Sequence, residues 1–360
     1  MENNASRPER PESRVFAASG LYLLAAMGLF AVSFLSGPFV GMLSRVFPGI
    51  TREWAALATN VLYYRPFLYL PVVLWATRGR SQCLRLNPVS FGATVRIVVI
   101  ALLFFAGVYN INLLWSAAWQ RLGLNVFVSD YVRPANSGEL TRSVLSATLL
   151  AGVCEELLFR GVMLSAWEPR GGRRAVWVTA LLFAMLHGSL LGLPAQLLCG
   201  LLLALIVRWT DSIYGGMIFH SAYNAAAVLF NYVTSGMESG GTGEVDLFSA
   251  IGGVGSVASM LLGALFIGLM IWGLLQKFRV QFALKNGFAR MLNGQLPVNP
   301  TANPAERAAE MRRALADAMR STETPATDRA PLSAGTILVL AAGVLSALVL
   351  YALDIYGMLI

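Results

Sequence analysis

Charged residues are scarce in this chain. Only 13% of its 360 residues are Asp, Glu, Lys or Arg, whereas 56% are hydrophobic and the mean hydropathy is +0.63. Average soluble chains contain about 25% charged and about 45–50% apolar residues. The composition therefore excludes an intrinsically disordered chain and favours a polytopic membrane protein, whose apolar residues are grouped in spans of about 20 residues.

Cysteine, lysine and histidine are also rare. Three cysteines, Cys83, Cys154 and Cys199, are too few and odd in number for a disulfide framework, and we expect them to be buried packing residues. The net charge of +8 comes mostly from scattered arginines, so no nucleic-acid partner is expected. His187 and His220 are the only two histidines, which makes their positions informative.

Long apolar runs predict nine transmembrane helices. We expect them at about 15–35, 54–76, 94–119, 141–166, 174–189, 191–209, 213–233, 249–275 and 333–356. Each is near the length of about 20 residues that a bilayer requires. The fifth run is short and is followed by Gly188, Gly192 and Pro194, so a broken or re-entrant turn is the alternative there. The predicted fold class is an all-α, polytopic transmembrane helix bundle with eight or nine spans.

The distribution of Lys and Arg predicts the orientation. With the N-terminus in the cytoplasm, the cytoplasmic segments hold 19 of these residues and the outside loops hold 5. This asymmetry fits the positive-inside rule, and we expect a multi-pass protein of the plasma (inner) membrane.

The same division gives the expected domains: a cytoplasmic tail at 1–14, a transmembrane domain at 15–275, a cytoplasmic polar segment at 276–332 and a C-terminal span at 333–356. Within the polar segment, hydrophobic spacing predicts an amphipathic helix at about 304–320. Asn303 can cap this helix and Pro304 suits its first turn.

Glu155, Glu156 and Arg160 lie in the middle of the fourth predicted span. Ionisable residues in spans cost at least about 2.5–3.5 kcal/mol each on insertion scales and usually have a function. Glu156 and Arg160 are four residues apart on one helix face, which predicts a buried ion pair. Glu155 is rotated from Glu156 by about 100°. Because one arginine does not neutralise two carboxylates, we predict that Glu155 faces a cavity. The alternative is one buried ion cluster that fixes helix packing.

Each histidine lies in a later predicted span. His187 follows Phe183 by four residues, and Asn224 follows His220 by four residues. Either histidine alone is explained as a packing group that hydrogen-bonds across helices. Together with a carboxylate, however, one imidazole can activate water, while the other imidazole and a carboxamide can donate to an oxyanion. These groups meet the needs of amide hydrolysis.

The usual alternative protease motifs are missing. The sequence has no HExxH zinc motif and no Gly-x-Ser-x-Gly elbow. Asp354 stands alone near the C-terminus, so no aspartate pair is available inside the spans. Cys154 neighbours Glu155, but a buried apolar thiol is normally inert.

The motifs, taken in order, resemble the CPBP family of intramembrane proteases. This family includes CAAX proteases of the Ras-converting type, bacteriocin-processing enzymes and abortive-infection proteins. The motifs are Glu155-Glu156-x-x-x-Arg160, Phe183-x-x-x-His187 and His220-x-x-x-Asn224. The resemblance covers a protease-like core at about 141–233, a quarter of the chain, and the outer spans show no family signature.

The resemblance implies a membrane-embedded endopeptidase with its active-site cavity between core helices. It also implies that Glu155 and His187 activate the water, while His220 and Asn224 stabilise the oxyanion. The residues expected to support the site are Glu156, Arg160 and Phe183. A zinc ion held by Glu155, His187 and His220 is the alternative. We prefer the metal-free, cofactor-free mechanism because it gives each histidine a role.

The substrate does not follow from the resemblance. Family members act on prenylated CAAX proteins or on bacterial peptides, so the expected partners are the lipid bilayer and a peptide or protein substrate, lipidated or not. A non-catalytic membrane scaffold or peptide-binding protein is the alternative function. A transporter that uses the buried charges as a relay is a third hypothesis, but no two related halves are visible. We favour the enzyme, because a scaffold has no need of all four predicted catalytic groups.

Overall fold

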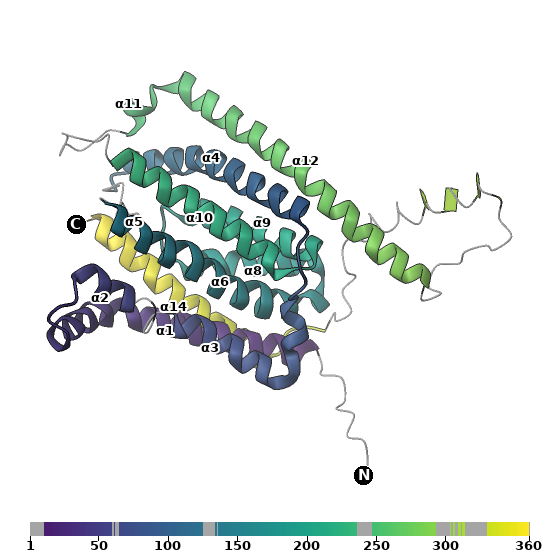
Figure 1. Ribbon diagram of the computed structural model, residues 1–360, viewed down its shortest axis with the longest axis horizontal. Coiled ribbons are helices and arrows are strands. Elements are labelled where there is room, and N and C mark those ends of the chain that lie inside the picture. The colour runs from purple at the N-terminus through teal and green to yellow at the C-terminus, as the bar shows by residue number, and fades with distance from the viewer. Residues whose placement is uncertain are drawn as a thin grey trace, which may run out of the picture.

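The computed structural model describes residues 11–59, 61, 65–124, 134, 136–235, 247–292, 303, 305–306, 309–310, 312–313 and 330–359. Over these residues every regular element is helical, which confirms the predicted all-α bundle (Figure 1). The longer elements are α1 (Pro11–Val46), α2 (Arg52–Thr59), α3 (Pro66–Trp75), α4 (Phe91–Arg121), α8 (Gly172–Leu186), α9 (Leu193–Thr210), α10 (Ile213–Ser235), α12 (Val254–Leu292) and α14 (Ala334–Leu359). The shorter ones are η2 (Ala76–Arg80), η3 (Ser81–Leu84), α5 (Ser137–Ser143), η4 (Val144–Leu150), α6 (Ala151–Glu156), η5 (Leu157–Leu164), α7 (Ser165–Trp167), η6 (Glu168–Arg170) and α11 (Leu247–Ile251).

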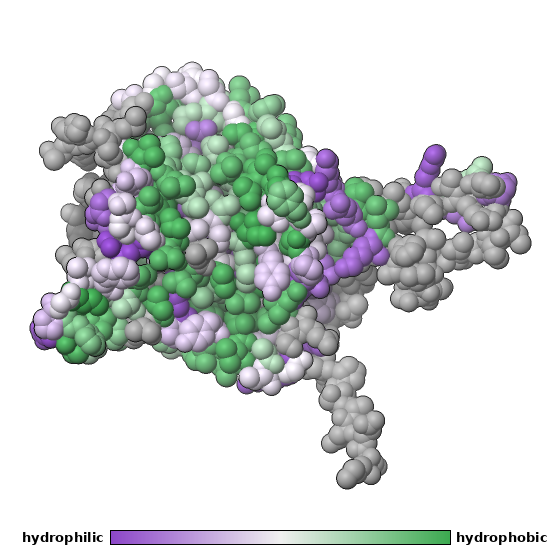
Figure 2. Space-filling view, viewed as in Figure 1, coloured by the Kyte–Doolittle hydropathy of each residue, from purple (hydrophilic) through white to green (hydrophobic). Residues whose placement is uncertain are grey.

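Long apolar helices identify the chain as an integral membrane protein. Five described segments are long and apolar enough to cross a bilayer: Glu12–Val32, Phe91–Arg121, Leu193–Thr210, Val254–Lys285 and Ala334–Met358. They overlap the first, third, sixth, eighth and ninth predicted spans. Figure 2 shows hydrophobic residues over most of the visible face of the bundle, as contact with lipid tails requires. The count of eight or nine spans and the orientation stay predictions.

Other predicted spans have a more complex form. The run at 54–76 is divided between α2 and α3. The run at 141–166 lies in consecutive helical segments from α5 to α7, in which the π-helical η4 and η5 flank α6 on both sides. Wider π turns of this kind occur frequently at functional sites. The site glutamates lie on α6, between these two turns.

A turn follows α8 where the sequence predicted one. Gly188 has φ +59°, a left-handed conformation that glycine adopts at little cost, and Pro194 lies in the first turn of α9. Helices α8 and α9 then pack closely, because a Cβ atom on Gly200 would lie only 2.9 Å from Ala180 Cα. The turn therefore connects two helices that pack side by side.

The predicted polar segment at 276–332 is described only in part. Helix α12 continues to Leu292, so the segment expected from residue 276 starts inside a helix. Farther on, Asn303 Oδ1 accepts hydrogen bonds from the N–H groups of Ala305 and Glu306 at 3.0 and 2.9 Å, the cap that its position predicted. Much of the predicted helix at 304–320 and residues 1–10 of the predicted tail lie outside the described residues.

The bundle is arranged in layers around α8, α9, α10 and the α6 segment (Figure 1). Helix α4 packs on α10 and carries α12 on its outer side, whereas α14 packs against both α1 and α8. The interior is closely filled by buried aromatic rings, among them Phe159, Phe183 and Phe219. Against this apolar background, the buried charges of α6 mark the site.

Candidate active site

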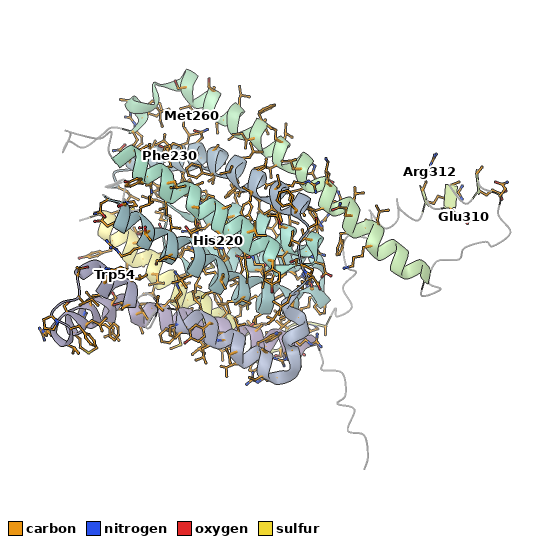
Figure 3. The ribbon with its side chains drawn as sticks, viewed as in Figure 1. Trp54, His220, Phe230, Met260, Glu310 and Arg312 are labelled. Carbon is orange, nitrogen blue, oxygen red and sulfur yellow. The ribbon has the colours of Figure 1, made fainter. Side chains whose placement is uncertain are left out.

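The four predicted catalytic residues line one cavity of about 280 Å³ between the core helices. Glu155 comes from α6, His187 follows the last residue of α8, and His220 and Asn224 lie one turn apart on α10. His220 lies in the middle of the bundle, as Figure 3 shows. Helical spacing predicted which of these residues share a face. The fold then brings α6, the end of α8 and α10 together around the cavity.

Glu155 is the central group of the cavity. Its Oε2 atom lies 3.7 Å from His187 Nε2 and 4.0 Å from His220 Nε2. These distances are too long for direct hydrogen bonds but suit an atom bridging between the groups. Glu155 Oε2 is buried and has no hydrogen-bond partner among the described residues. The carboxylate therefore offers an oxygen that is free to act on a bound water or substrate.

The two imidazole rings present the same nitrogen to Glu155. His187 Nδ1 lies 2.8 Å from the Phe183 carbonyl oxygen, and His220 Nδ1 lies 3.0 Å from Glu156 Oε1. Since a carbonyl or carboxylate oxygen only accepts, we infer that each Nδ1 carries a hydrogen. Each Nε2 then faces the cavity, as an acceptor when the ring is neutral and as a donor when it is protonated.

Glu156 and Arg160 form the ion pair that their spacing predicted. Arg160 Nη1 donates to Glu156 Oε1 at 3.0 Å, and both side chains are fully buried. Arg160 Nη2 also donates to the carbonyl oxygen of Gly200 on α9 at 3.1 Å. Because Glu156 Oε1 contacts His220 as well, this pair links α6 to both α9 and α10 and orients the His220 ring.

Phe183 fills the space between these charged groups. Its ring lies edge-on to both imidazoles, and its centroid is 4.7 Å from that of His187 and 5.8 Å from that of His220. The Arg160 guanidinium lies 4.5 Å from the centroid of the Phe183 ring. Its carbonyl oxygen accepts the hydrogen bond from His187. Phe183 thus supports both imidazoles, through its ring and its backbone.

Asn224 lines the cavity and is also hydrogen-bonded to the backbone of η4. Its Nδ2 atom donates to the carbonyl oxygen of Ala147 on η4 at 2.7 Å. The neighbouring Ser221 Oγ donates to the carbonyl oxygen of Thr148 at 3.1 Å. An amide nitrogen carries two hydrogens, so the contact with Ala147 leaves a second one for another acceptor.

Arg65 is the site residue that sequence reasoning missed. It immediately precedes α3, is only 6% exposed, and lines the cavity. Its Nη1 atom lies 3.6 Å from Glu155 Oε1, and its Nη2 atom donates to the carbonyl oxygen of Ser146 at 3.2 Å. The sequence argument considered Arg160 alone beside the two carboxylates, and the structure adds Arg65 beside Glu155. The position of Arg65 within an apolar run, the feature that identified Glu155, was the available signal.

His187 is more exposed than the two other ionisable groups that converge in the cavity. The side chain of His187 is 30% exposed, against 14% for Glu155 and 4% for His220. Further polar groups on the wall are Gln196, Tyr223 and Asn231, and the apolar wall includes Ala147, Ala195, Ala227 and Val228.

The three candidate zinc ligands are spaced more widely than a zinc site requires. Ligand atoms 2.0–2.1 Å from a tetrahedral ion lie about 3.4 Å apart, whereas Glu155 Oε2 is 3.7 and 4.0 Å from the two Nε2 atoms. Over the described residues, no group of three or more His, Cys, Asp or Glu side chains is placed to hold a metal ion. Closing the site on zinc would need a small inward movement of both histidines.

Comparison with known proteins gives one match. Residues 138–226 match the family model described as type II CAAX prenyl endopeptidase Rce1-like. No curated protein and no solved structure matches the chain. The matched segment runs from α5 into α10 and includes all seven motif residues and the whole of α6, α8 and α9. The part of the chain that carries the site is therefore similar to the type II CAAX prenyl endopeptidase Rce1-like family, as the motifs predicted.

Proposed function

We propose that this chain is an intramembrane endopeptidase of the CAAX type, in which Glu155 and His187 activate a water molecule. The observation that supports the proposal is the convergence of Glu155 Oε2 and the Nε2 atoms of His187 and His220 at one wall of the cavity. The family match over the same residues supports the same reaction class.

The geometry suits a water held between two acceptors. With Nδ1–H of His187 bonded to the Phe183 carbonyl, the water donates one hydrogen to His187 Nε2 and the other to Glu155 Oε2. The water oxygen attacks the carbonyl carbon of the scissile bond as Glu155 takes its proton. Glu155 then returns this proton to the leaving amine nitrogen as the C–N bond breaks, which restores the carboxylate.

His220 and Asn224 supply the oxyanion site in this mechanism. His220 Nδ1 bonds to Glu156, which leaves Nε2 facing the cavity, where the N–H of a protonated ring donates to the developing oxyanion. Asn224 donates through the N–H that is not bonded to Ala147. Fixed donors of this kind commonly give the largest electrostatic contribution to such a reaction.

Arg65 sets the orientation of the base. It lies nearest to Glu155 Oε1, whereas the two histidines lie nearest to Glu155 Oε2. Held at Oε1, Glu155 directs Oε2 to the water. Arg65 thus acts as a positioning residue for Glu155 in the proposed reaction.

A prenylated peptide is the substrate class that the proposal favours. The name of the matching family refers to a prenyl endopeptidase, and a CAAX cysteine carries its lipid three residues from the C-terminus. A lipidated peptide is held at the membrane by its lipid chain, so its scissile bond can enter a cavity within the bundle. An unlipidated peptide is the competing substrate class.

The test uses purified protein in lipid nanodiscs and two fluorescence-quenched peptides that differ only in an S-farnesyl group. We expect cleavage of the farnesylated peptide by the wild type and a loss of at least about 100-fold in Glu155→Gln, the lower scale for one general base. Cys154→Ala is the matched control and should cleave normally, because no step uses that thiol.

Other outcomes identify other functions. Faster cleavage of the unlipidated peptide would redirect the substrate assignment while keeping the enzyme. Binding of either peptide without cleavage, unchanged in Glu155→Gln, would favour the non-catalytic scaffold. Substrates beyond these two probes can be sought in membrane proteomes. New peptide termini that form with the wild type and not with Glu155→Ala would identify them.

A further inference from the structure

His187 lies at the C-terminal end of α8, where the hydrogen bonds within the helix are incomplete. Its backbone N–H bonds to the Ala184 carbonyl at 3.2 Å, and Gly188 follows in the left-handed conformation. Helix ends lack part of their internal hydrogen bonds and open more easily than helix interiors. The position of the imidazole therefore depends on what holds the turn at 187–192.

The C-terminal helix α14 contacts this turn directly. Asp354 Oδ2 accepts a hydrogen bond from the backbone N–H of Leu190 at 2.7 Å. Tyr351 Oη, three residues earlier on the same face of α14, donates to the carbonyl oxygen of Ala184 at 2.9 Å. One contact thus lies on each side of His187 along the chain.

Helix α4 also contacts the turn at 187–192. Trp115 Nε1 donates to the carbonyl oxygen of Leu190 at 2.9 Å, so both backbone polar groups of Leu190 are bonded to side chains of other helices. The Leu190 side chain is buried in a cluster with Leu124, Tyr351 and Met358. The turn is held through its backbone and its side chain together.

The fit between the turn and α14 is close. A Cβ atom on Gly188 would lie 2.5 Å from Leu350 Cβ, so the backbone of the turn rests directly on α14. Asp354 is an acidic residue within an apolar span, and such a residue usually has a function and a definable partner. Its partner here is the turn that carries His187, and α14 lies outside the matched segment at 138–226.

We propose that α14 holds the His187 turn in place, and that Asp354 and Tyr351 are positioning residues for His187. The effect on turnover rests on the proposed protease function, whereas the effect on the turn does not. Removing the acceptor at residue 354 frees the Leu190 N–H and loosens the turn. The imidazole then spends less time at the distance from Glu155 that the reaction requires.

Turnover is the first measurement. We expect Asp354→Ala to lower kcat on the farnesylated quenched peptide about tenfold with KM within about twofold, because misplacement of a catalytic group by about 1 Å can cost up to about 100-fold. Asp354→Asn keeps an acceptor oxygen and should recover most of the rate. Leu353→Ala, on a lipid-exposed neighbour, is the matched control and should behave as the wild type.

Amide hydrogen exchange is the second measurement, and it needs no substrate. In Asp354→Ala, peptides covering 186–193 should exchange at least about tenfold faster than in the wild type, with α9 and α10 unchanged. Tyr351→Phe removes a single hydroxyl and should show a smaller change in the same peptides. This second variant keeps the test valid if Asp354→Ala folds poorly.

The two measurements separate the two hypotheses. Wild-type exchange in both Asp354→Ala and Tyr351→Phe would overturn the role of α14. Faster exchange with wild-type kcat would overturn the positioning of His187 while leaving the contact. Faster exchange in Asp354→Ala, together with a wild type that cleaves neither peptide, would support the contact between α14 and the turn. The same result would count against the proposed protease function.

Discussion

Glu155 and Glu168 each face arginine side chains, but their carboxylates are used differently. Glu168 is the first residue of η6; Arg208 Nε donates to its Oε1 at 2.9 Å, and Arg85 Nη2 donates to its Oε2. Both of its oxygens are thus in direct contact with a guanidinium. The cation nearest to Glu155, Arg65, lies 3.6 Å from one oxygen, and the histidines lie farther from the other.

The surroundings of the two groups extend this difference. The Glu168 network continues through Asp211, which lies 3.7 Å from Arg85 and 3.0 Å from the exposed Lys285. That network joins the chain after η3, η6, the end of α9 and α12. Glu155 instead faces a cavity. A carboxylate with saturated oxygens holds elements together, whereas one with an oxygen left available can exchange a proton.

Replacing each glutamate by glutamine is the strongest test of the different roles of Glu155 and Glu168. Glu155→Gln should abolish activity, with a loss of about 10²–10⁴-fold, and keep the melting temperature in detergent, because the amide retains the shape but not the base. Glu168→Gln should do the opposite and lower the melting temperature while the folded fraction keeps its kcat. Thermal unfolding and peptide cleavage on the same samples give both values. A normal rate in Glu155→Gln would remove the general base from the mechanism.

Asn224→Ala separates the metal-free mechanism from the zinc mechanism. Loss of one oxyanion donor should lower kcat about 10²–10³-fold with little change in KM, and chelators should leave the wild type unaffected. In the zinc mechanism the ligands Glu155, His187 and His220 survive this substitution. A strong chelator would then remove activity that added zinc restores. Elemental analysis that finds one zinc per chain, lost in His187→Ala, would contradict our preference.

The buried pair predicts a loss of stability. Glu156→Ala or Arg160→Ala leaves a charge unpaired in an apolar interior, which typically costs about 3–5 kcal/mol. Lys285→Ala is the control, because its ion pair with Asp211 is exposed and worth at most about 1 kcal/mol. The yield of folded protein and its thermal stability measure both effects. Equal stability of all three variants would show that the pair does not hold α6.

Arg65 should give the smallest effect on activity. Arg65→Gln removes the charge beside Glu155 Oε1 and should lower kcat about tenfold, on the scale of a misplaced catalytic group. Arg65→Lys keeps the charge and should recover part of this loss, with KM similar in both variants. If the two variants had the same kcat, the charge of Arg65 would have no part in orienting Glu155.

Sequence patterns predicted the helices and the site more completely than their connections. Apolar length gave most helical segments, and i, i+4 spacing paired Glu156 with Arg160 and placed His220 and Asn224 on one face. Helical periodicity says which side chains share a face, but it does not give distances between helices. The approach of Arg65 to Glu155 joins residues far apart in the chain and was therefore not predicted.

The contact of Asp354 is a second one that the sequence could not predict. The sequence presented it as a lone acid near the C-terminus, and the residue that it contacts is 164 positions earlier in the chain. Its partner is a backbone N–H, which no side-chain pattern marks. The apolar pattern likewise did not predict the division of the run at 54–76 into α2 and α3 or the continuation of α12 to Leu292.

The position of α14 also has a consequence for biosynthesis. The turn that carries His187 leaves the ribosome 164 residues before Asp354, the residue that holds it. At synthesis rates of about 5–20 residues per second, this interval lasts roughly 10–30 s. During this time the nascent chain has its carboxylates and imidazoles but lacks α14. If α14 positions His187 as proposed, the site reaches its full activity only after α14 has been synthesised and has packed against the turn.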